Sequence, residues 1–554
     1  MTKRASVMRL VGAGGLLLAL VAGSTAGSNM TAFAGPPAGS TVESGGAVPM
    51  SLTPTSIRPA SPDLLALGAR IYATQCAACH GIEGRGDGEA AYLLYPKPRD
   101  FTAGRFALTS TWERVPTNED LYRTISRGMP GSAMPSWGHL AEEERWGLVH
   151  YVKSFVPQPW QIPPAADPKD GGVGKGVIRV PPEPPFTPEA RARALELYAD
   201  ACASCHGKTG RGDGAEEQKD DKGYPTRPRD LTLGVFKGSP EPAQLYRRVV
   251  AGMPGTPMPM SDWAYGPDAW HLVHLVRSWS SDEQRARVEM RKFQLVARRV
   301  SRLPDHPDDG AWRLAQPVNL HLMPLWWRTD RPEELTVRAL HDGRELTLLL
   351  VWADATPDHT AVRPQDFRDA AAVEFSLTPD PPFFGMGAKG EFVNIWMWKS
   401  ERQADLEPAF QDLEKVYPNL GIDSYPNPLV SPVEQPTRHA LTLRSDPTFV
   451  TGWGAGNIVA DPLRQSAAED LAAQGFGTLK ARPRIDQAVD ARGVYGTGTY
   501  RVVFHRALAG RGERAVSLAP GQTVPVAFAV WNGSAGDRDG KKSVTIWQEL
   551  RLEP

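Results

Sequence analysis

The chain has 554 residues, with 62 basic and 63 acidic side chains and a formal net charge of -1 at pH 7. At this length a single hydrophobic core is not expected, and three or four domains are. The even charge balance argues against nucleic acid or another polyanion as a ligand. The 51 prolines and 53 glycines indicate many loops and linkers around ordered modules.

Residues 1–34 have the features of an export signal. Lys3, Arg4 and Arg9 form a basic start, residues 10–21 form a short apolar core, and Ala-Phe-Ala at 32–34 is a suitable cleavage site. The apolar run is shorter than the roughly 20 residues that a spanning helix needs, although an uncleaved anchor is an alternative. We expect cleavage before a flexible leader at 35–62, a periplasmic location, and no membrane-spanning segment in the mature chain.

All four cysteines lie in two Cys-x-x-Cys-His pentapeptides. Two thiols three positions apart on a nascent helix can form thioethers with the two vinyl groups of one porphyrin, and the adjacent histidine then faces the iron. A zinc half-site or a redox-active thiol pair uses the same Cys-x-x-Cys spacing, but the immediate histidine removes most of that ambiguity. Each pentapeptide therefore predicts a covalent c haem, and the predicted haem-binding residues are Cys76, Cys79, His80, Cys202, Cys205 and His206.

The sequence around each pentapeptide is duplicated. The motifs that recur in the same order are Gly-Arg-Gly-Asp-Gly (84–88 and 210–214), Pro-Arg-Asp (98–100 and 228–230) and Met-Pro-Gly (129–131 and 253–255). Apolar residues at helical spacing precede each pentapeptide and close each repeat. We predict two small helical domains, at 63–156 and 189–282, joined by a Pro/Gly-rich spacer at 157–188.

Both repeats resemble class I cytochromes c throughout. The resemblance implies a second axial ligand, a methionine before proline ~50 residues after the pentapeptide, and it falls on Met134 and Met258. The alternatives are Met129, Met253 and Met260, which we interpret as packing or capping residues. A thioether ligand favours ferrous iron and raises the reduction potential, as suits an electron carrier.

The same resemblance implies supporting contacts around each haem. A backbone carbonyl near Pro98 or Pro228 would accept a hydrogen bond from the ligand histidine and fix its tautomer. Arg99 and Arg229 are candidates to pair with haem propionates, and pairing with the neighbouring aspartate is the alternative.

From about residue 305 the helical pattern gives way to short alternating segments. These are 335–340, 346–353, 372–377, 392–398, 500–505, 524–531 and 544–552. Turn signals such as Asp342-Gly343 and Asn532-Gly533 separate them. We predict an all-β antiparallel sandwich over 305–554, with the poorly patterned stretch 421–477 forming loops around one end.

Residues 349–354 and 393–399, with 530–533 and the closing segment, resemble the haem b domain of ethylbenzene-dehydrogenase-type gamma subunits. That family includes electron-transfer subunits of dimethyl sulfide, selenate, chlorate and some nitrate or nitrite oxidoreductases. It holds a non-covalent haem b by a methionine and a lysine, which correspond here to Met386 and Lys542. Lys541 is a neighbouring alternative. A haem-free sandwich related to carbohydrate-binding modules is the competing interpretation.

The predicted architecture is therefore multidomain, with two all-α class I cytochrome c domains followed by the sandwich. The predicted function is a periplasmic multihaem protein, with two c haems and one b haem, that relays electrons between a partner oxidoreductase of the molybdenum-cofactor class and another cytochrome or terminal acceptor. No catalytic residue is assigned. The alternatives are a dihaem peroxidase-like enzyme, and a dihaem cytochrome whose haem-free sandwich binds a ligand.

Overall fold

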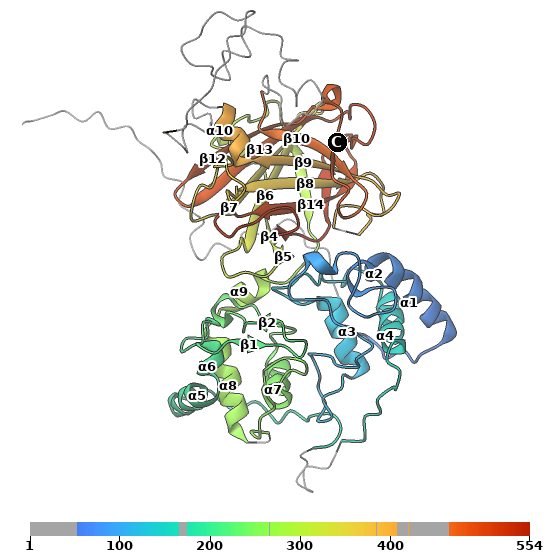
Figure 1. Cartoon of the computed structure of the whole chain (residues 1–554), viewed down its shortest axis with the longest axis vertical. Coiled ribbons are helices and arrows are strands. Elements are labelled where there is room, and N and C mark those ends of the chain that lie inside the picture. The colour runs from blue at the N-terminus through green and yellow to red at the C-terminus, as the bar shows by residue number, and fades with distance from the viewer. Residues whose placement is uncertain (1–51, 166–173, 265, 384, 407–418, 420–464) are drawn as a thin grey trace, which may run out of the picture. The chain divides into compact units, whose positions relative to one another are not determined.

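The computed structural model describes residues 52–165, 174–264, 266–383, 385–406, 419 and 465–554 (Figure 1). The predicted signal, most of the leader and most of the 421–477 stretch lie outside the described residues. Among the helices of the described ranges, none has the length and apolar character needed to cross a membrane.

The first repeat is a small helical domain. Its elements are α1 (Pro62–Gln75), α2 (Ala77–His80), η1 (Ala91–Leu93), α3 (Asn118–Arg127) and α4 (Glu142–Ser154). Helices α1 and α4 cross at Gly68 and Gly147, where a Cβ atom on Gly68 would lie 2.1 Å from the Gly147 carbonyl oxygen. Glycine is required at this crossing because the two backbones touch. Tyr72, Tyr122 and Trp146 fill the core beside it and are almost fully buried.

The second repeat has the same order of helices, which confirms the predicted duplication. Its elements are α5 (Pro188–Ala201), α6 (Ala203–His206), β1 (Gln218–Lys219), β2 (Pro225–Thr226), η3 (Leu231–Leu233), α7 (Pro242–Ala251), α8 (Pro267–Ser278) and α9 (Asp282–Arg287). Equivalent tyrosines make equivalent bonds: the Tyr72 hydroxyl donates to the Gly81 carbonyl at 2.7 Å, and the Tyr198 hydroxyl donates to the Gly207 carbonyl at 2.8 Å.

The described part of the linker packs between the repeats and does not act as a free spacer. The Ile178 N–H donates to the Ser110 carbonyl at 2.8 Å, and the Trp112 N–H donates to the Gly176 carbonyl at 3.0 Å. Ile178 is completely buried and lies with Trp112 in the core of the second repeat. The composition of the linker did not predict this packing. A single apolar residue, Ile178, holds the proline-rich stretch against the second repeat.

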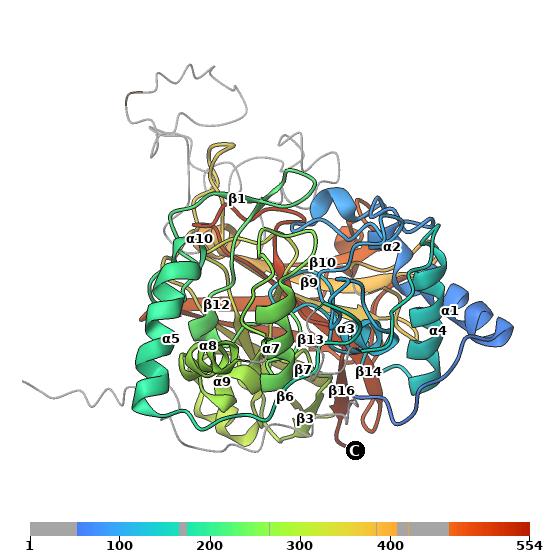
Figure 2. The same ribbon diagram turned by 90° about the horizontal axis from the view of Figure 1, so that it is seen from below.

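The β region is one continuous 14-stranded sheet whose two halves share a single apolar core, as a sandwich requires. Its strands are β3 (Gln294–Arg299), β4 (Val318–His321), β5 (Met323–Pro324), β6 (Glu334–His341), β7 (Glu345–Ala353), β8 (Ala370–Ser376), β9 (Val393–Lys399), β10 (Ala468–Ala473), β11 (Lys480–Ala481), β12 (Asp490–Gly496), β13 (Thr499–Ala507), β14 (Thr523–Trp531), β15 (Ser543–Val544) and β16 (Gln548–Leu552). The short helices η4 (Gly310–Leu314), α10 (Ser400–Leu406) and η7 (Arg484–Asp486) lie in its loops. The main strand order is β11-β10-β9-β8-β14-β16-β3-β6-β7-β13-β12, and Figure 2 gives a second view.

The expectation of a purely antiparallel sandwich needs one correction. Strand β3 pairs in parallel with both β16 and β6, whereas the other paired strands among the described residues run antiparallel. This strand precedes residue 305, where we expected the β region to begin, and it joins the two halves of the sheet. Its inward-facing Leu295 and Ala297 belong to the same core as Phe375, Phe504 and Phe528. The six-residue strand was missed because it follows directly on a helical domain.

The half of the sheet that contains β8, β9 and β14 is apolar on both faces. Side chains alternate along each strand, so in β14 Phe528 and Val530 face the sandwich core while Ala529 and Trp531 face outward. An apolar outer face has to be covered. In this protein Ala90 and Leu94 of the first repeat pack into the same outer cluster.

Candidate haem sites

The first Cys-x-x-Cys-His pentapeptide lies at the end of α1 and forms the short helix α2. Cys76, Cys79 and His80 line a cavity of about 200 Å³. The glycine-rich loop wraps over the pentapeptide, and the Gly86 N–H donates to the His80 carbonyl at 2.8 Å. A Cβ atom on Gly88 would lie 2.3 Å from the Ala78 carbonyl oxygen, so only glycine permits this close approach.

The imidazole of His80 is oriented as an iron ligand requires. Its Nδ1 atom lies 3.0 Å from the carbonyl oxygen of Arg99, which is the acceptor expected near Pro98. Burial lowers the pKa of His80 to about 4, so the ring is neutral at pH 7. In the tautomer that donates from Nδ1 to this carbonyl, Nε2 keeps the lone pair that a metal needs.

The second pentapeptide lines a larger cavity of about 520 Å³ with Cys202, Cys205 and His206. The loop over it is the same, because the Gly212 N–H donates to the His206 carbonyl at 2.9 Å. Burial, and then the charge of Lys237, lowers the pKa of His206 to about 4. The expected acceptor near Pro228 is not engaged, since the buried His206 Nδ1 atom has no hydrogen-bond partner among the described residues.

The predicted methionines and their alternatives lie together in each cavity. Met134 and Met129 both line the first, and Met258, Met253 and Met260 all line the second. The Met129 N–H donates to the Met134 carbonyl at 3.0 Å, and the Met253 N–H donates to the Met258 carbonyl at 3.1 Å. Met253 is 5% exposed and Met260 is 47% exposed. The assignment of Met134 and Met258 as ligands therefore stays a prediction.

A third cavity, of about 510 Å³, lies over the outer face of the sheet formed by β8, β9 and β14. Met386 and Lys542, far apart in the chain, both line it. Lys541 does not belong to its lining; this side chain is exposed, and its Nζ atom lies 5.3 Å from the centre of the Trp326 ring. The structure thus brings the predicted pair together and separates it from the neighbouring lysine.

Lys542 is 9% exposed, and its Nζ atom lies 5.0 Å from the centre of the Trp531 ring. Burial lowers the pKa of Lys542, while the charge of Glu374 opposes this effect. A lowered pKa favours the neutral amine, which is the only form of lysine that can donate a lone pair to a metal.

Glu374 was missed in the sequence, although it is the one charged side chain in the buried strand β8. Burial raises its pKa to about 8, and the charge of Lys542 lowers it. Its Oε1 atom has no hydrogen-bond partner in the described ranges. A single acid inside a run of buried apolar residues is a signal that sequence analysis could have used.

Met386 has a backbone φ of 94°, in a region that non-glycine residues rarely adopt. Its carbonyl accepts a hydrogen bond from the Gly475 N–H at 2.8 Å. Such backbone strain is concentrated at sites that hold ligands. An apolar cavity with a thioether on a constrained loop and a buried amine suits a non-covalent haem b.

The three cavities are next to one another. Tyr92 and Leu93 of η1 line the third cavity, and the following residue, Leu94, lines the first. The first and second cavities share the lining residues Thr226, Arg229, Lys237 and Thr256. No local sequence pattern predicts these shared walls, because they depend on how the domains pack.

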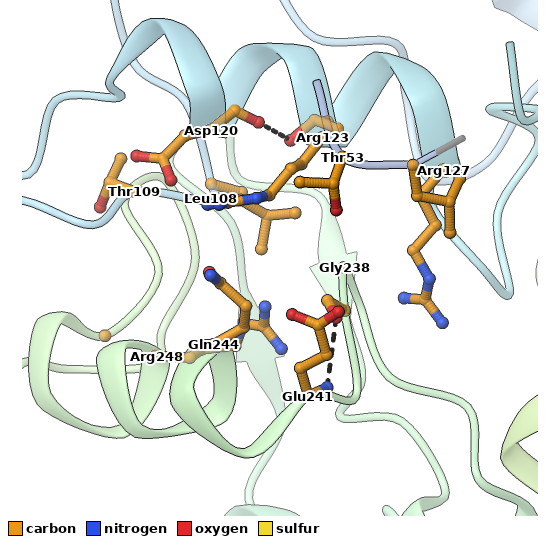
Figure 3. Close-up of a pocket in the computed structure, with 15 residues that line it drawn as sticks. Thr53, Leu108, Thr109, Asp120, Arg123, Arg127, Gly238, Glu241, Gln244 and Arg248 are labelled. Atoms are coloured by element: carbon orange, nitrogen blue, oxygen red, sulfur yellow. Dashed lines mark hydrogen bonds between the residues drawn. The ribbon is translucent and has the colours of Figure 1, made fainter. Parts of the chain in front are cut away.

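A small cleft of about 60 Å³ between α3 and α7 is a different feature (Figure 3). It is lined by Arg123, Arg127, Gln244 and Arg248 together with acidic side chains, and contains none of the predicted haem ligands. Arg127 is engaged elsewhere, since its Nη2 atom lies 2.7 Å from Glu289 Oε1. The three larger cavities, which contain the predicted ligands, are therefore the candidate haem sites.

Comparison with known proteins gives matches to both parts of the chain. The cytochrome c family matches residues 65–155 and 192–280, and the ethylbenzene dehydrogenase family matches residues 310–543. The putative respiratory nitrate reductase heme subunit of Haloferax mediterranei is 27% identical over 225 residues, which are 40% of this chain and 57% of that protein. The chain thus spans less than two thirds of that relative.

Two other relatives are gamma subunits. Dimethylsulfide dehydrogenase subunit gamma of Rhodovulum sulfidophilum is 28% identical over 272 residues, covering 46% of this chain and 77% of that protein. Chlorate reductase subunit gamma of Ideonella dechloratans is 24% identical over 256 residues, which are 44% of this chain and 79% of that protein. With the two pentapeptides in the helical repeats and the third cavity on the sandwich, these matches identify the chain as two cytochrome c domains followed by a domain of the ethylbenzene dehydrogenase family.

Proposed function

We propose that this chain is a periplasmic electron-transfer protein that carries two covalent c haems and one non-covalent b haem. Met134 and Met258 complete the ligation of the c haems, and Met386 and Lys542 hold the b haem. The protein relays electrons to or from a partner oxidoreductase of the molybdenum-cofactor class. The names of the relatives support this role, since one is a reductase heme subunit and two are gamma subunits of a dehydrogenase and a reductase.

The observation that carries the proposal is the contiguity of the three cavities. Leu93 lines the b-haem cavity and Leu94 lines the first c-haem cavity, and consecutive Cα atoms are only about 3.8 Å apart. The first and second c-haem cavities share four lining residues, Thr226, Arg229, Lys237 and Thr256. This arrangement supports the order b haem, first c haem, second c haem, and a single chain holds all three at high effective concentration.

The candidate ligands in the first and third cavities are in the form that coordination of iron requires. His80 is kept neutral by burial and is held by the Arg99 carbonyl, and Lys542 is shifted toward its neutral form. The apolar walls exclude water, which limits reorganisation around a changing charge. Bound iron would supply the one-electron chemistry, with methionine ligation favouring the reduced state.

A pyridine haemochrome assay of the purified full chain tests the proposal, performed before and after extraction with acidified acetone. We expect a ratio of two c haems, which resist extraction, to one b haem, which is removed. Two c haems without b haem would favour the haem-free ligand-binding sandwich. A five-coordinate, high-spin c haem in the same preparation would favour the peroxidase-like enzyme.

A further inference from the structure

Two cationic side chains, the buried Arg229 and the half-buried Lys237, lie where the two c-haem cavities meet. Arg229 and Lys237 each line both cavities. Arg229 is 7% exposed, and its Nε atom lacks a hydrogen-bond partner among the described residues. Within the same residues, no carboxylate forms a salt bridge with either side chain. Buried charges of like sign are costly unless an anion compensates them.

The electrostatic environment of the two side chains favours an anion beside them. Burial, and after it the charges of Arg229, Arg99 and Arg248, lower the pKa of Lys237 to about 7. Burial, and after it the charge of Arg331, also lowers the pKa of Arg229 to about 10, and the charge of Glu333 opposes this shift. Asp220 opposes the shift of Lys237 only in part, since it is the last of the contributing charges. An anion between the two cations would restore the full charge on both.

Arg229 also reaches the neighbouring repeat. A Cβ atom on Gly131, in the methionine loop of the first repeat, would lie 3.0 Å from Arg229 Nε. Its sequence equivalent Arg99 reaches Gly255, in the methionine loop of the second repeat, where a Cβ atom would lie 2.7 Å from Arg99 Nη1. The two arginines differ in their acidic neighbours: Arg99 lies 3.9 Å from the carboxylate of Asp221, whereas the acid that acts on Arg229, Glu333, forms its salt bridge with Arg331.

We infer that Arg229 and Lys237 form one anion site that binds carboxylates from both c haems, namely a propionate of each. This inference rests on the proposed function, and it adds that the two haems share their counter-charges. A guanidinium group binds carboxylate through paired N–H donors, and a buried position strengthens that contact. The two c haems are then electrostatically coupled through residues of the second repeat alone.

The coupling has a defined sign. A positive charge near the iron disfavours the oxidised state, which carries one more positive charge than the reduced state. Removing the charge of Arg229 should therefore lower the reduction potentials of both c haems. Removing Arg99, which Asp221 already neutralises, should lower mainly the potential of the first haem, whose cavity it lines.

The test is a spectroelectrochemical titration of the full haem-loaded chain. The variants are Arg229→Gln, Arg229→Lys and Lys237→Met, with Arg211→Gln as the control because Arg211 is an exposed arginine of the same repeat. In Arg229→Gln and Lys237→Met, both c-haem transitions should move to lower potential. In Arg229→Lys and Arg211→Gln, they should stay near those of the unmodified chain.

Haem content, measured first, separates the two proposals. A chain without covalent haem would refute the proposed function. A chain with two c haems in which only one transition moves, or neither, would refute the shared site alone. If Arg229→Gln lost its c haems while Lys237→Met left both potentials unchanged, the shared site would also be wrong. Titrating the unmodified chain with inorganic phosphate at constant ionic strength distinguishes the source of the anion: the potentials should not respond if propionates fill the site, and a response would assign it to a free anion instead.

Discussion

The two cytochrome c repeats share their haem-binding motifs but differ in the segment between the glycine-rich loop and the Pro-Arg-Asp motif. In the first repeat this segment is residues 89–97, where Ala90, Ala91 and Leu94 are buried. In the second repeat it is residues 215–227, which contain a run of charged residues and the hairpin of β1 and β2.

Each segment forms part of the wall of a neighbouring cavity, and the two segments differ in chemistry. The first repeat places the apolar Leu93 in the wall of the b-haem cavity. The second repeat places Asp221 and Lys222 at the first c-haem cavity, where Lys222 Nζ lies 3.4 Å from Asp100 and Arg105 lies 3.5 Å from Asp221. Both repeats thus retain the Cys-x-x-Cys-His motif, but the segment that contacts the neighbouring cavity differs between them.

The largest expected effect is at the site that the first repeat borders. Lys542→Ala should abolish b-haem retention, because Lys399, the other lysine that lines the cavity, is held by Glu469 at 3.3 Å and is not free to replace the lost amine. Both c haems should stay attached, since their thioethers are local to the pentapeptides. Haem extraction followed by a pyridine haemochrome assay measures both quantities.

Lys541→Ala is the matched control. It removes the same kind of side chain at the neighbouring position, which does not line the cavity. It should leave the b-haem content unchanged. A normal b-haem content in Lys542→Ala would exclude Lys542 as the ligand, and loss in Lys541→Ala alone would move the assignment by one residue.

Next in size is the effect of removing the methionine ligands, which should be the same in both repeats. Met134→Ala should convert only the first c haem to high spin with a lower potential, and Met258→Ala only the second. The controls are Met129→Ala and Met253→Ala, which remove methionines from the same loops. Electronic absorption and magnetic circular dichroism report the spin state. If Met129→Ala gave the high-spin haem and Met134→Ala did not, Met129 would be the ligand of the first repeat. The same comparison of Met253→Ala with Met258→Ala applies to the second repeat.

A smaller effect is expected from the apolar segment that only the first repeat has. Leu93→Ala removes part of the wall of the b-haem cavity, and truncating a half-buried leucine costs about 1 kcal/mol. That loss corresponds to roughly a fivefold weaker affinity for b haem. Haem transfer to an excess of an apo-globin measures it. The control is Lys219→Ala, because Lys219 and Leu93 each lie five residues after the last glycine of their loop. This control should leave the affinity for b haem unchanged. An equal loss of affinity in Lys219→Ala would mean that such substitutions act by lowering the stability of the whole chain.

The two cytochrome c domains could be predicted from the sequence because the attachment motif lies within five consecutive residues. The sequence also predicts the sandwich because alternating strands carry their own periodicity, but it does not reveal β3, whose parallel pairing depends on strands far away in the chain. Met386 and Lys542 came from a resemblance, whereas the lining role of Leu93 had no local signal. The role of Arg229 toward a propionate stays a prediction, and its approach to Gly131 of the other repeat depends on tertiary packing alone.

The smallest expected effect tests the charged segment of the second repeat. Asp221 lines the first c-haem cavity and pairs with Arg99 and Arg105, so Asp221→Asn removes a negative charge near that haem. The oxidised state loses stabilisation, and the potential of the first c haem should rise. A partly exposed ion pair is worth roughly 0.2–1 kcal/mol, or on the order of 10–40 mV for one electron.

This shift has the opposite sign to that of Arg229→Gln and should be confined to one haem. It should also shrink in 1 M salt, where screening acts within about 3 Å. Glu217→Gln is the control, because Glu217 is an exposed acid of the same segment that lines neither c-haem cavity. Equal shifts in the reduction potentials of both c haems in Asp221→Asn would contradict the prediction that this segment affects only the first haem. Such a result would indicate that a charge anywhere between the repeats changes both potentials.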